Sequence, residues 1–259
     1  MKKPVNQVEM DGNIVKITPI SDIHFGDNNC KVSKLLQTIN LISKNKYHYW
    51  FGLGDWFDSI LITDKRSKKD DRSDTMFRER RKLMDMVEPI KDRCLGMADG
   101  NHENVLAKIG VGSPVQDICE QWDVPYLRYS GFMKIKPPRR FHNRPIIIYY
   151  HHGASAGRFT GSAVNRVEGL SQHWGADAYC VGHSHKLFQT IQPYIDWSGS
   201  HDKVFCNTGG FLETCTIGET GYGEVAGYPP QRLGTVTITW RCLGKGKNKL
   251  SISETDLSI

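Results

Sequence analysis

Short apolar segments that end in polar loops organise the first two thirds of the chain. Apolar and polar residues roughly alternate over residues 13–20, a pattern typical of a strand, and the polar segment 21–27 follows directly. The same change from apolar strand to polar loop recurs at residues 47–58, 94–104, 145–153 and 178–185. The pattern therefore predicts five strands, each of which delivers polar side chains to the loop at its carboxyl end.

Helical spacing of apolar residues fills much of the chain between these strands. Residues 31–44 are predicted to form a helix, because Val32, Leu35 and Ile39 fall on one helical face. Further helices are predicted over about residues 74–93 and 162–174. Ser113 followed by Pro114 is typical of a helix start, with serine as the N-cap and proline at the first helical position. Residues 64–74 are strongly charged and are expected to form a solvated loop.

Strand patterns dominate the later part of the chain. Two strands are predicted around a turn at Pro137 and Pro138, and others at residues 204–207, 234–241 and 250–253. Alternating strands and helices followed by a strand-rich region predict one α/β domain over residues 1–259, with two sheets and helices outside them. In such sheets, ligands gather at the carboxyl ends of the strands, where all the polar loops of the first part lie.

The composition is ordinary for a globular protein, with 39% hydrophobic and 24% charged residues among 259. The net charge of +6 favours an anionic partner, without selecting nucleic acid over a small phosphorylated substrate. The seven cysteines are odd in number and form no CxxC pair, which argues against a disulfide framework. We find no signal-peptide pattern and no apolar stretch near the ~18 residues of a membrane span, so we expect a cytoplasmic protein without a membrane partner.

The polar loops carry residues that bind metal ions. Asp22 and His24 can aim at one ion, because alternate residues share a side of an extended chain. A carboxylate such as Asp55 can bridge two cations. Imidazole and carboxylate ligands together suit manganese, iron, zinc, cobalt or nickel better than calcium. The candidate ligands are Asp22, His24, Asp55, Asn101, His152, His183 and His185. We therefore expect two divalent metal ions, with manganese as the first choice.

The motifs resemble, in the same order, the signature of the calcineurin-like metallophosphoesterase superfamily. That signature is D-x-H, G-D-x-x-D, G-N-H-E/D, a strand that ends in H-G, and G-H-x-H, and all five parts lie within residues 21–185. The resemblance implies a four-layer sandwich of two mixed β-sheets with helices on the outer faces. It also implies that the strands of about residues 203–255 belong to the second sheet.

The resemblance implies a role for each motif residue. One metal site would be formed by Asp22, His24, Asp55 and His185. The other would be formed by Asp55, Asn101, His152 and His183, with Asp55 shared. His102 would face the leaving oxygen of the substrate, and Asp58 would orient it.

Two neighbouring histidines compete for one ligand position. The family ligand directly precedes glycine, which selects His152, and strand alternation should point His151 away from the site. The chain departs from the protein Ser/Thr phosphatases, because Ser59 and Ile60 follow Asp58, and Ala154 follows Gly153. A phosphoprotein substrate is therefore not expected.

Substrate contacts are less defined by the sequence. Arg158 could bind a phosphate through its guanidinium fork, or it could be a surface arginine. Asn101 could contact the substrate in addition to a metal. Residues 207–210 follow a strand and could form another loop near the site. Phe25 and Trp56 flank candidate ligands and could form a pocket wall or part of the core.

The leading function is two-metal-dependent hydrolysis of a phosphoester bond by a metal-bridging hydroxide. The enzyme would be a phosphodiesterase or phosphatase, and its substrate a nucleotide-like or small phosphoester. The alternative is a DNA or RNA nuclease of the repair-exonuclease branch, favoured by basic residues at 65–72, 78–82 and 139–140 and opposed by interspersed acidic residues. A non-catalytic metal-bearing scaffold is a third possibility, which the complete ligand set and His102 disfavour. The substrate and the oligomeric state stay open.

Overall fold

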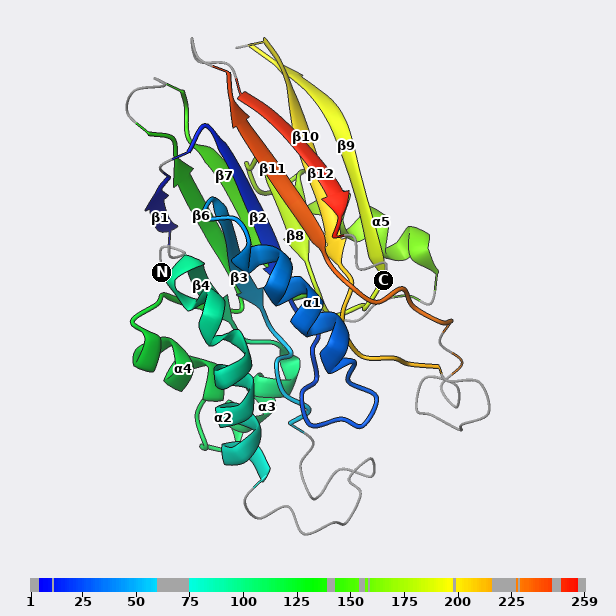
Figure 1. The fold of residues 1–259 in the computed structure, drawn as a ribbon. Coiled ribbons are helices and arrows are strands. Elements are labelled where there is room, and N and C mark those ends of the chain that lie inside the picture. The colour runs from blue at the N-terminus through cyan, green and yellow to red at the C-terminus, as the bar shows by residue number, and fades with distance from the viewer. Residues whose placement is uncertain are drawn as a thin grey trace.

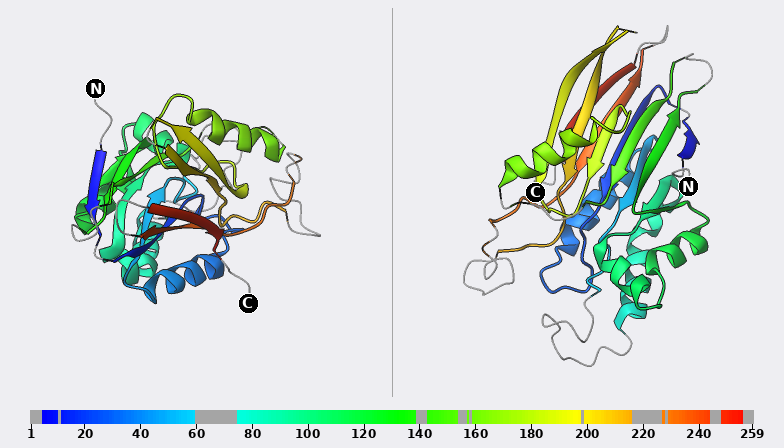
Figure 2. Two further views of the ribbon diagram at one scale, coloured as in Figure 1. Left: turned by 90° about the horizontal axis from the view of Figure 1, so that it is seen from above. Right: turned by 180° about the vertical axis from the view of Figure 1, so that it is seen from behind.

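Two mixed six-stranded sheets pack face to face, with helices on their outer faces (Figures 1 and 2). The computed structural model describes residues 5–10, 12–59, 75–138, 143–153, 157, 159–197, 199–215, 227, 229–243 and 248–255. The charged segment 64–74 and Arg158 lie outside these residues. The predicted α/β architecture of two mixed sheets covered by helices is confirmed.

The first sheet has the order β12-β11-β2-β3-β4-β5. Its strands β2, β3, β4 and β5 are parallel, so the loops that follow them meet at one edge. Antiparallel β11 and β12 extend the sheet beyond β2. The bounds are β2 (Ile14–Ile20), β3 (His48–Leu53), β4 (Cys94–Ala98), β5 (Tyr126–Arg128), β11 (Val236–Cys242) and β12 (Asn248–Glu254).

The second sheet has the order β1-β6-β7-β8-β10-β9. Strands β7, β8 and β10 are parallel, and β6 pairs antiparallel with β7 across the predicted turn. The bounds are β1 (Val5–Glu9), β6 (Ser130–Lys136), β7 (Ile146–His151), β8 (Ala178–Val181), β9 (Leu187–Asp196) and β10 (Gly199–Thr208).

The C-terminal strands divide between the two sheets, which corrects the expectation for residues 203–255. Only β10 lies in the second sheet, whereas β11 and β12 lie in the first. The register of β11 on β2 pairs Ile238 with Ile17 and Trp240 with Val15. All four side chains are buried, so this pairing extends the apolar face of the first sheet.

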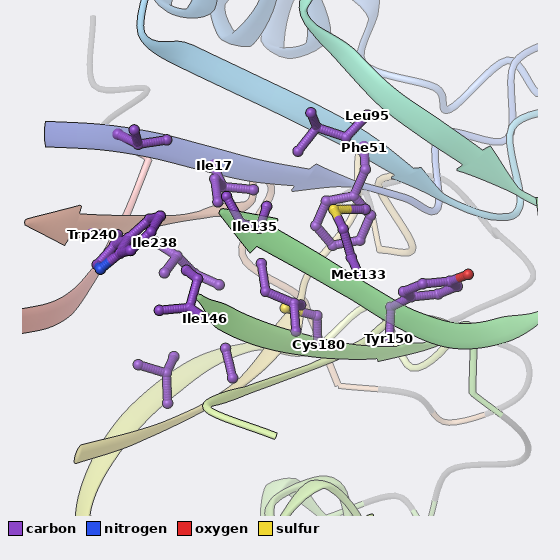
Figure 3. Close-up of a cluster of buried hydrophobic side chains, with 14 of the residues drawn as sticks. Ile17, Phe51, Leu95, Met133, Ile135, Ile146, Tyr150, Cys180, Ile238 and Trp240 are labelled. Atoms are coloured by element: carbon purple, nitrogen blue, oxygen red, sulfur yellow. The ribbon is translucent and has the colours of Figure 1, made fainter. Parts of the chain in front are cut away.

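Apolar side chains from both sheets form the central layer (Figure 3). Ile17 and Phe51 of the first sheet and Met133 and Tyr150 of the second are fully buried there. Strand β6 alternates strictly between buried and half-buried residues, as expected for a strand with one face on the core. Because each fully buried large apolar side chain contributes about 1.5–3 kcal/mol, this layer fixes how the two sheets face each other.

Helices cover the outer faces of both sheets, on opposite sides of the strands (Figure 2). The first sheet packs against α1 (Val32–Ser43), α2 (Thr75–Val87), the 3₁₀ helix η1 (Glu88–Arg93) and α4 (Pro114–Trp122). The second sheet packs against α5 (Thr160–Leu170). Among the described residues, no helix has the length and apolar character needed to cross a membrane.

Some helix boundaries differ from the prediction. The long helix expected over residues 74–93 ends as α-helix at Val87 and continues as η1, because Pro89 lacks the N–H that an α-helix needs. The predicted start at Ser113 is confirmed, since its side chain accepts hydrogen bonds from the backbone N–H of Val115 and Gln116. Helix α3 (Asn101–Lys108) begins inside a motif that was predicted as a loop.

Candidate metal centre

The candidate ligands lie just beyond the carboxyl ends of strands from both sheets. Asp22 and His24 follow β2, Asp55 follows β3, and Asn101 begins α3 after β4. In the second sheet, His152 follows β7, and His183 and His185 follow β8. The structure brings all seven predicted ligands together in two neighbouring groups.

Backbone hydrogen bonds join the loops that follow β2 and β3. The N–H groups of Ile23 and His24 both donate to the carbonyl oxygen of Asp55, at 2.8 and 3.1 Å. The N–H of Asp22 donates to the carbonyl oxygen of Gly54 at 3.0 Å. Gly54 has a φ of +90°, and a Cβ there would lie 2.5 Å from the Gly100 nitrogen and the His152 ring. Only glycine therefore lets these loops approach so closely.

Left-handed backbone is concentrated at the candidate ligands. Five of them have φ between 50° and 69°, namely Asp22, His24, Asp55, His183 and His185. A non-glycine residue held in this region costs on the order of 1–3 kcal/mol, and such residues cluster at functional sites. The surrounding fold therefore holds these side chains in place at a cost to stability.

The first ligand group contains Asp22, His24 and His185, whose ligand atoms lie within 4.8 Å of one another. The Nε2 atoms of His24 and His185 face each other at 3.2 Å. His185 Nε2 lies 3.5 Å from Asp22 Oδ1. The other carboxylate oxygen of Asp22 accepts hydrogen bonds from the Ser21 hydroxyl at 2.5 Å and from the His183 N–H at 3.0 Å.

The second ligand group contains Asp55, His152 and His183, together with the amide oxygen of Asn101. Asn101 Oδ1 lies 3.0 Å from His152 Nε2 and 2.6 Å from His183 Nδ1. His152 Nδ1 donates to the carbonyl oxygen of Leu53 at 2.7 Å, which turns Nε2 towards the group.

Asp55 lies between the two groups. Its Oδ2 is 3.2 Å from His152 Nε2 in the second group and 3.8 Å from His24 Nε2 in the first. Its Oδ1 accepts a hydrogen bond from the His102 N–H at 3.0 Å. One carboxylate oxygen therefore faces both groups, while the other holds the start of α3.

The residues present fit divalent cations. Asp22 Oδ1 is buried without a hydrogen-bond partner, which is unfavourable for a carboxylate oxygen unless a cation or donor compensates it. The imidazoles of His24, which is buried, and His185, which is partly buried, bring their nitrogens together beside this oxygen. A cation coordinated there would satisfy the carboxylate oxygen and both ring nitrogens.

Burial and neighbouring charges move the pKa values of the site histidines apart. Burial, with the His24 ring adding to it, holds the pKa of His185 well below its usual value. Burial, followed by His152, lowers the pKa of His183 to about 4. Burial is the largest influence on His152 and acts to lower its pKa, but Asp55, together with Asp22 and the Leu53 carbonyl, raises that pKa to about 9. His183 and His185 are therefore neutral near pH 7, the form that binds metal.

The predicted acid and its orienting carboxylate lie beside the first group. His102 Nδ1 is 3.5 Å from Asp58 Oδ1, and the His102 ring meets the His24 ring edge-on at a centroid distance of 4.5 Å. Asp58 Oδ1 also lies 3.9 Å from His24 Nδ1. The His102 side chain is 13% exposed, so it is accessible at the edge of the site.

The other predicted residues have different environments. Trp56 is fully buried and packs near Trp50 in the core between the first sheet and its helices, so it does not form a pocket wall. Phe25 is partly buried and packs against the same core. His151 Nδ1 accepts a hydrogen bond from the Gly153 N–H at 2.8 Å, which shapes the turn that carries His152.

Residues 207–210 lie next to Asp22, near the site as the sequence suggested, but Asn207 and Thr208 end β10 and do not form a loop. The hydroxyl groups of Thr208 and Ser21 are 2.5 Å apart, and Ser21 in turn donates to Asp22. A Cβ at Gly210 would lie 2.9 Å from the Cβ of Asp22. This segment therefore supports a candidate ligand.

Sequence reasoning missed two supporting side chains. Glu103 is buried beneath the loop of Asp55, although the motif had included it without a role. Lys186, which follows His185, is also buried and donates to the carbonyl oxygens of Gly157 and Phe159 at 2.6 and 2.8 Å. Glu103 could have been noticed from its motif, whereas no local pattern indicates the contacts of Lys186.

Five sequence motifs from two sheets thus meet at one edge, in the order and with the side chains that the signature requires. The chain resembles the calcineurin-like metallophosphoesterases. Its fold of two mixed sheets covered by helices is the architecture which that resemblance implies.

Similarity between this chain and other proteins was found in structure only. No family model and no curated protein sequence matches it. A Vps29 double mutant from Entamoeba histolytica is 10% identical, with 94% of this chain and 99% of that chain covered and a TM-score of 0.40. The nuclease MPE of Pseudomonas putida is 11% identical, with 91% and 87% covered and a TM-score of 0.37. A metallophosphoesterase from Sphaerobacter thermophilus is 12% identical, with 94% and 88% covered and a TM-score of 0.40. The calcineurin-like resemblance therefore rests on the motifs and their geometry.

Proposed function

We propose that the chain hydrolyses phosphoester bonds with two divalent metal ions, manganese being the first choice, and acts on a phosphodiester or monoester of a nucleotide-like or small molecule. The observation that carries this proposal is the position of Asp55. Its Oδ2 faces His152 Nε2 at 3.2 Å and His24 Nε2 at 3.8 Å, so one oxygen is shared by two ligand groups.

The two groups would hold one ion each. Asp22, His24 and His185 would bind the first, and Asn101, His152 and His183 the second, with Asp55 between them. Two ions at such a site activate water for attack and stabilise the charge on phosphate oxygens. The protein supplies fixed ligands, because the left-handed backbone at five of the seven and the hydrogen bonds around them leave little freedom to rearrange.

His102 would donate a proton to the leaving group, and Asp58 would orient the His102 ring. Asp58 lies on the Nδ1 side of His102, which leaves Nε2 to face the substrate. An imidazole held in this way can donate a proton to a leaving alkoxide, a contribution typically worth ~10²–10⁴-fold in rate.

Initial rates on a chromogenic phosphodiester and on the matching monoester, with Mn²⁺ or with EDTA, test the proposal. We expect hydrolysis that EDTA abolishes and that Asp55→Asn removes. Asp177→Asn is a matched control, because Asp177 is a buried carboxylate that precedes β8, at the end opposite the site. A rate on the monoester alone would define a phosphatase. No rate on either ester by Mn²⁺-bound protein would refute the proposal.

A nuclease is the second candidate, and the position of α2 favours it. Arg78, Arg81 and Lys82 of this helix are exposed. The helix also approaches the loop after β2, since a Cβ at Gly26 would lie 2.5 Å from Glu79 Oε1. Binding of DNA or RNA that weakens steeply with salt would support this function. Binding that does not change with salt would exclude it.

A further inference from the structure

Glu103 is a fully buried carboxylate at the third position of α3. In the described part of the chain, no lysine or arginine forms an ion pair with it. Burying an unpaired carboxylate is costly unless hydrogen bonds satisfy it. The hydrogen bonds of this carboxylate must therefore compensate for its burial.

Four backbone N–H groups donate to this one carboxylate. Glu103 Oε1 accepts from Trp56 at 2.8 Å and from Phe57 at 3.0 Å. Glu103 Oε2 accepts from Asp55 at 3.0 Å and from Gly100 at 2.7 Å. Three of the donors are consecutive residues of the loop after β3, and Gly100 is the N-cap of α3 itself. The carboxylate therefore joins two ligand-bearing loops.

Asp55 and Glu103 hold each other's loops in a reciprocal arrangement. Glu103 accepts from the backbone of Asp55, and Asp55 Oδ1 accepts from the backbone of His102 at 3.0 Å. These bonds fix both the backbone of Asp55, whose φ is +52°, and the plane of its carboxylate. Only Oδ2 is left to face His24 and His152.

We propose that Glu103 is a positioning residue that sets the bridging orientation of Asp55, so that two ions can share one carboxylate oxygen. This inference rests on the proposed function for its two ions, but it concerns metal binding rather than turnover. Glu103→Gln keeps the size of the side chain and replaces one acceptor oxygen with an N–H donor. Two of the four backbone N–H groups then lose their acceptor, either those of Trp56 and Phe57 or those of Asp55 and Gly100. In both orientations the loop that carries Asp55 is held less firmly.

Mn²⁺ titration by calorimetry and low-temperature electron paramagnetic resonance test this role without turnover. We expect two exchange-coupled Mn²⁺ ions per wild-type chain, and in Glu103→Gln a second ion weakened at least tenfold with the coupling lost. That factor is the lower end of the effect typical for residues that orient metal ligands. We also expect a fall in kcat larger than the change in KM.

Asp177→Asn is the matched control for loss of a buried carboxylate. Asp177 Oδ2 accepts from the backbone N–H of Ile147 at 2.8 Å, so this variant also loses charge and part of a backbone anchor. It should be destabilised while keeping both coupled ions. A coupled pair in Glu103→Gln, with turnover within twofold of wild type, would overturn the proposal.

Glu103→Asp keeps the test available if Glu103→Gln does not fold. The shorter side chain retains the charge but cannot reach all four donors without a shift. It should weaken the second Mn²⁺ selectively, and unchanged affinity for both ions would overturn the proposal. Wild-type protein that binds a coupled pair but hydrolyses no ester would refute the proposed function and leave the role of Glu103 standing.

Discussion

His48 should make the stability of the fold depend on pH between 7 and 5. Its side chain is buried at the start of β3, and its Nε2 lies 2.7 Å from the hydroxyl oxygen of Thr18. Burial, followed by the charges of Lys16 and Arg93, lowers its pKa to about 4 from an ordinary value of 6.5. The folded protein therefore keeps this imidazole neutral where the unfolded chain takes up a proton.

The sign and the size of the effect follow from these two pKa values. The contribution of His48 is complete above pH 6.5 and is lost as the pH falls towards 4, because the unfolded state binds more protons. With about 1.4 kcal/mol for each pKa unit, lowering the pH from 7 to 5 should remove about 2 kcal/mol of unfolding free energy through this residue alone.

Urea unfolding of wild type and His48→Gln at pH 7 and pH 5, followed by far-UV circular dichroism in EDTA, measures this difference. Glutamine does not titrate, so the wild type should lose about 2 kcal/mol more than the variant. The other titrating groups are the same in both proteins, so their contributions cancel in the comparison. The substitution should not disturb the titrating groups of the candidate site, because His48 lies about 20 Å along the chain from Asp55. Exposed His173→Gln is the control and should lose as much as wild type. Equal losses in wild type and His48→Gln would refute the reasoning.

Four further predictions concern the site and its supports. His102→Ala should reduce hydrolysis by ~10²–10⁴-fold while calorimetry still detects both metal ions; loss of metal would mean that His102 is a ligand. Gly54→Ala should abolish metal binding measured by elemental analysis, since its Cβ would lie 2.5 Å from the His152 ring, and normal metal content would contradict the close packing. Ser113→Ala should destabilise the fold by about 1 kcal/mol in urea unfolding through loss of the N-cap, without changing metal affinity. Mn²⁺ at 100 times its Kd should add about 2.7 kcal/mol of stability for each ion bound and raise the Tm, and an unchanged Tm would argue against binding to the folded state.

The sequence predicted that the candidate ligands lie together because their pattern is local. Each candidate follows a strand within a few residues, and parallel strands bring the loops after them to the same edge. The choice of His152 over His151 came from the glycine that follows His152, and strand alternation predicted that His151 points away. The structure places the two side chains in different environments. Their chemical roles remain proposals that the experiments above test.

What the sequence could not predict depends on contacts between distant segments. Glu103 reaches the loop of Asp55 from 46–48 residues away, and no periodicity encodes that contact. A strand pattern also does not state which sheet a strand joins, so β11 and β12 were expected in the wrong one. Strand β9 was not expected because Ile191, Tyr194 and Ile195 stay exposed on an edge strand, where the usual alternation is lost.

The candidate ligands come from both sheets, and this has a mechanical consequence. Asp22, His24 and Asp55 are attached to one half of the sandwich, and His152, His183 and His185 to the other. Bound ions would cross-link the halves at one end only, while the opposite end is joined by apolar packing and by hydrogen bonds such as that from Asn143 Nδ2 to Asn248 Oδ1. In metal-loaded protein, the two sheets should therefore begin to separate at the end remote from the ions. Removal of the ions by a chelator should make the two ends comparably easy to open.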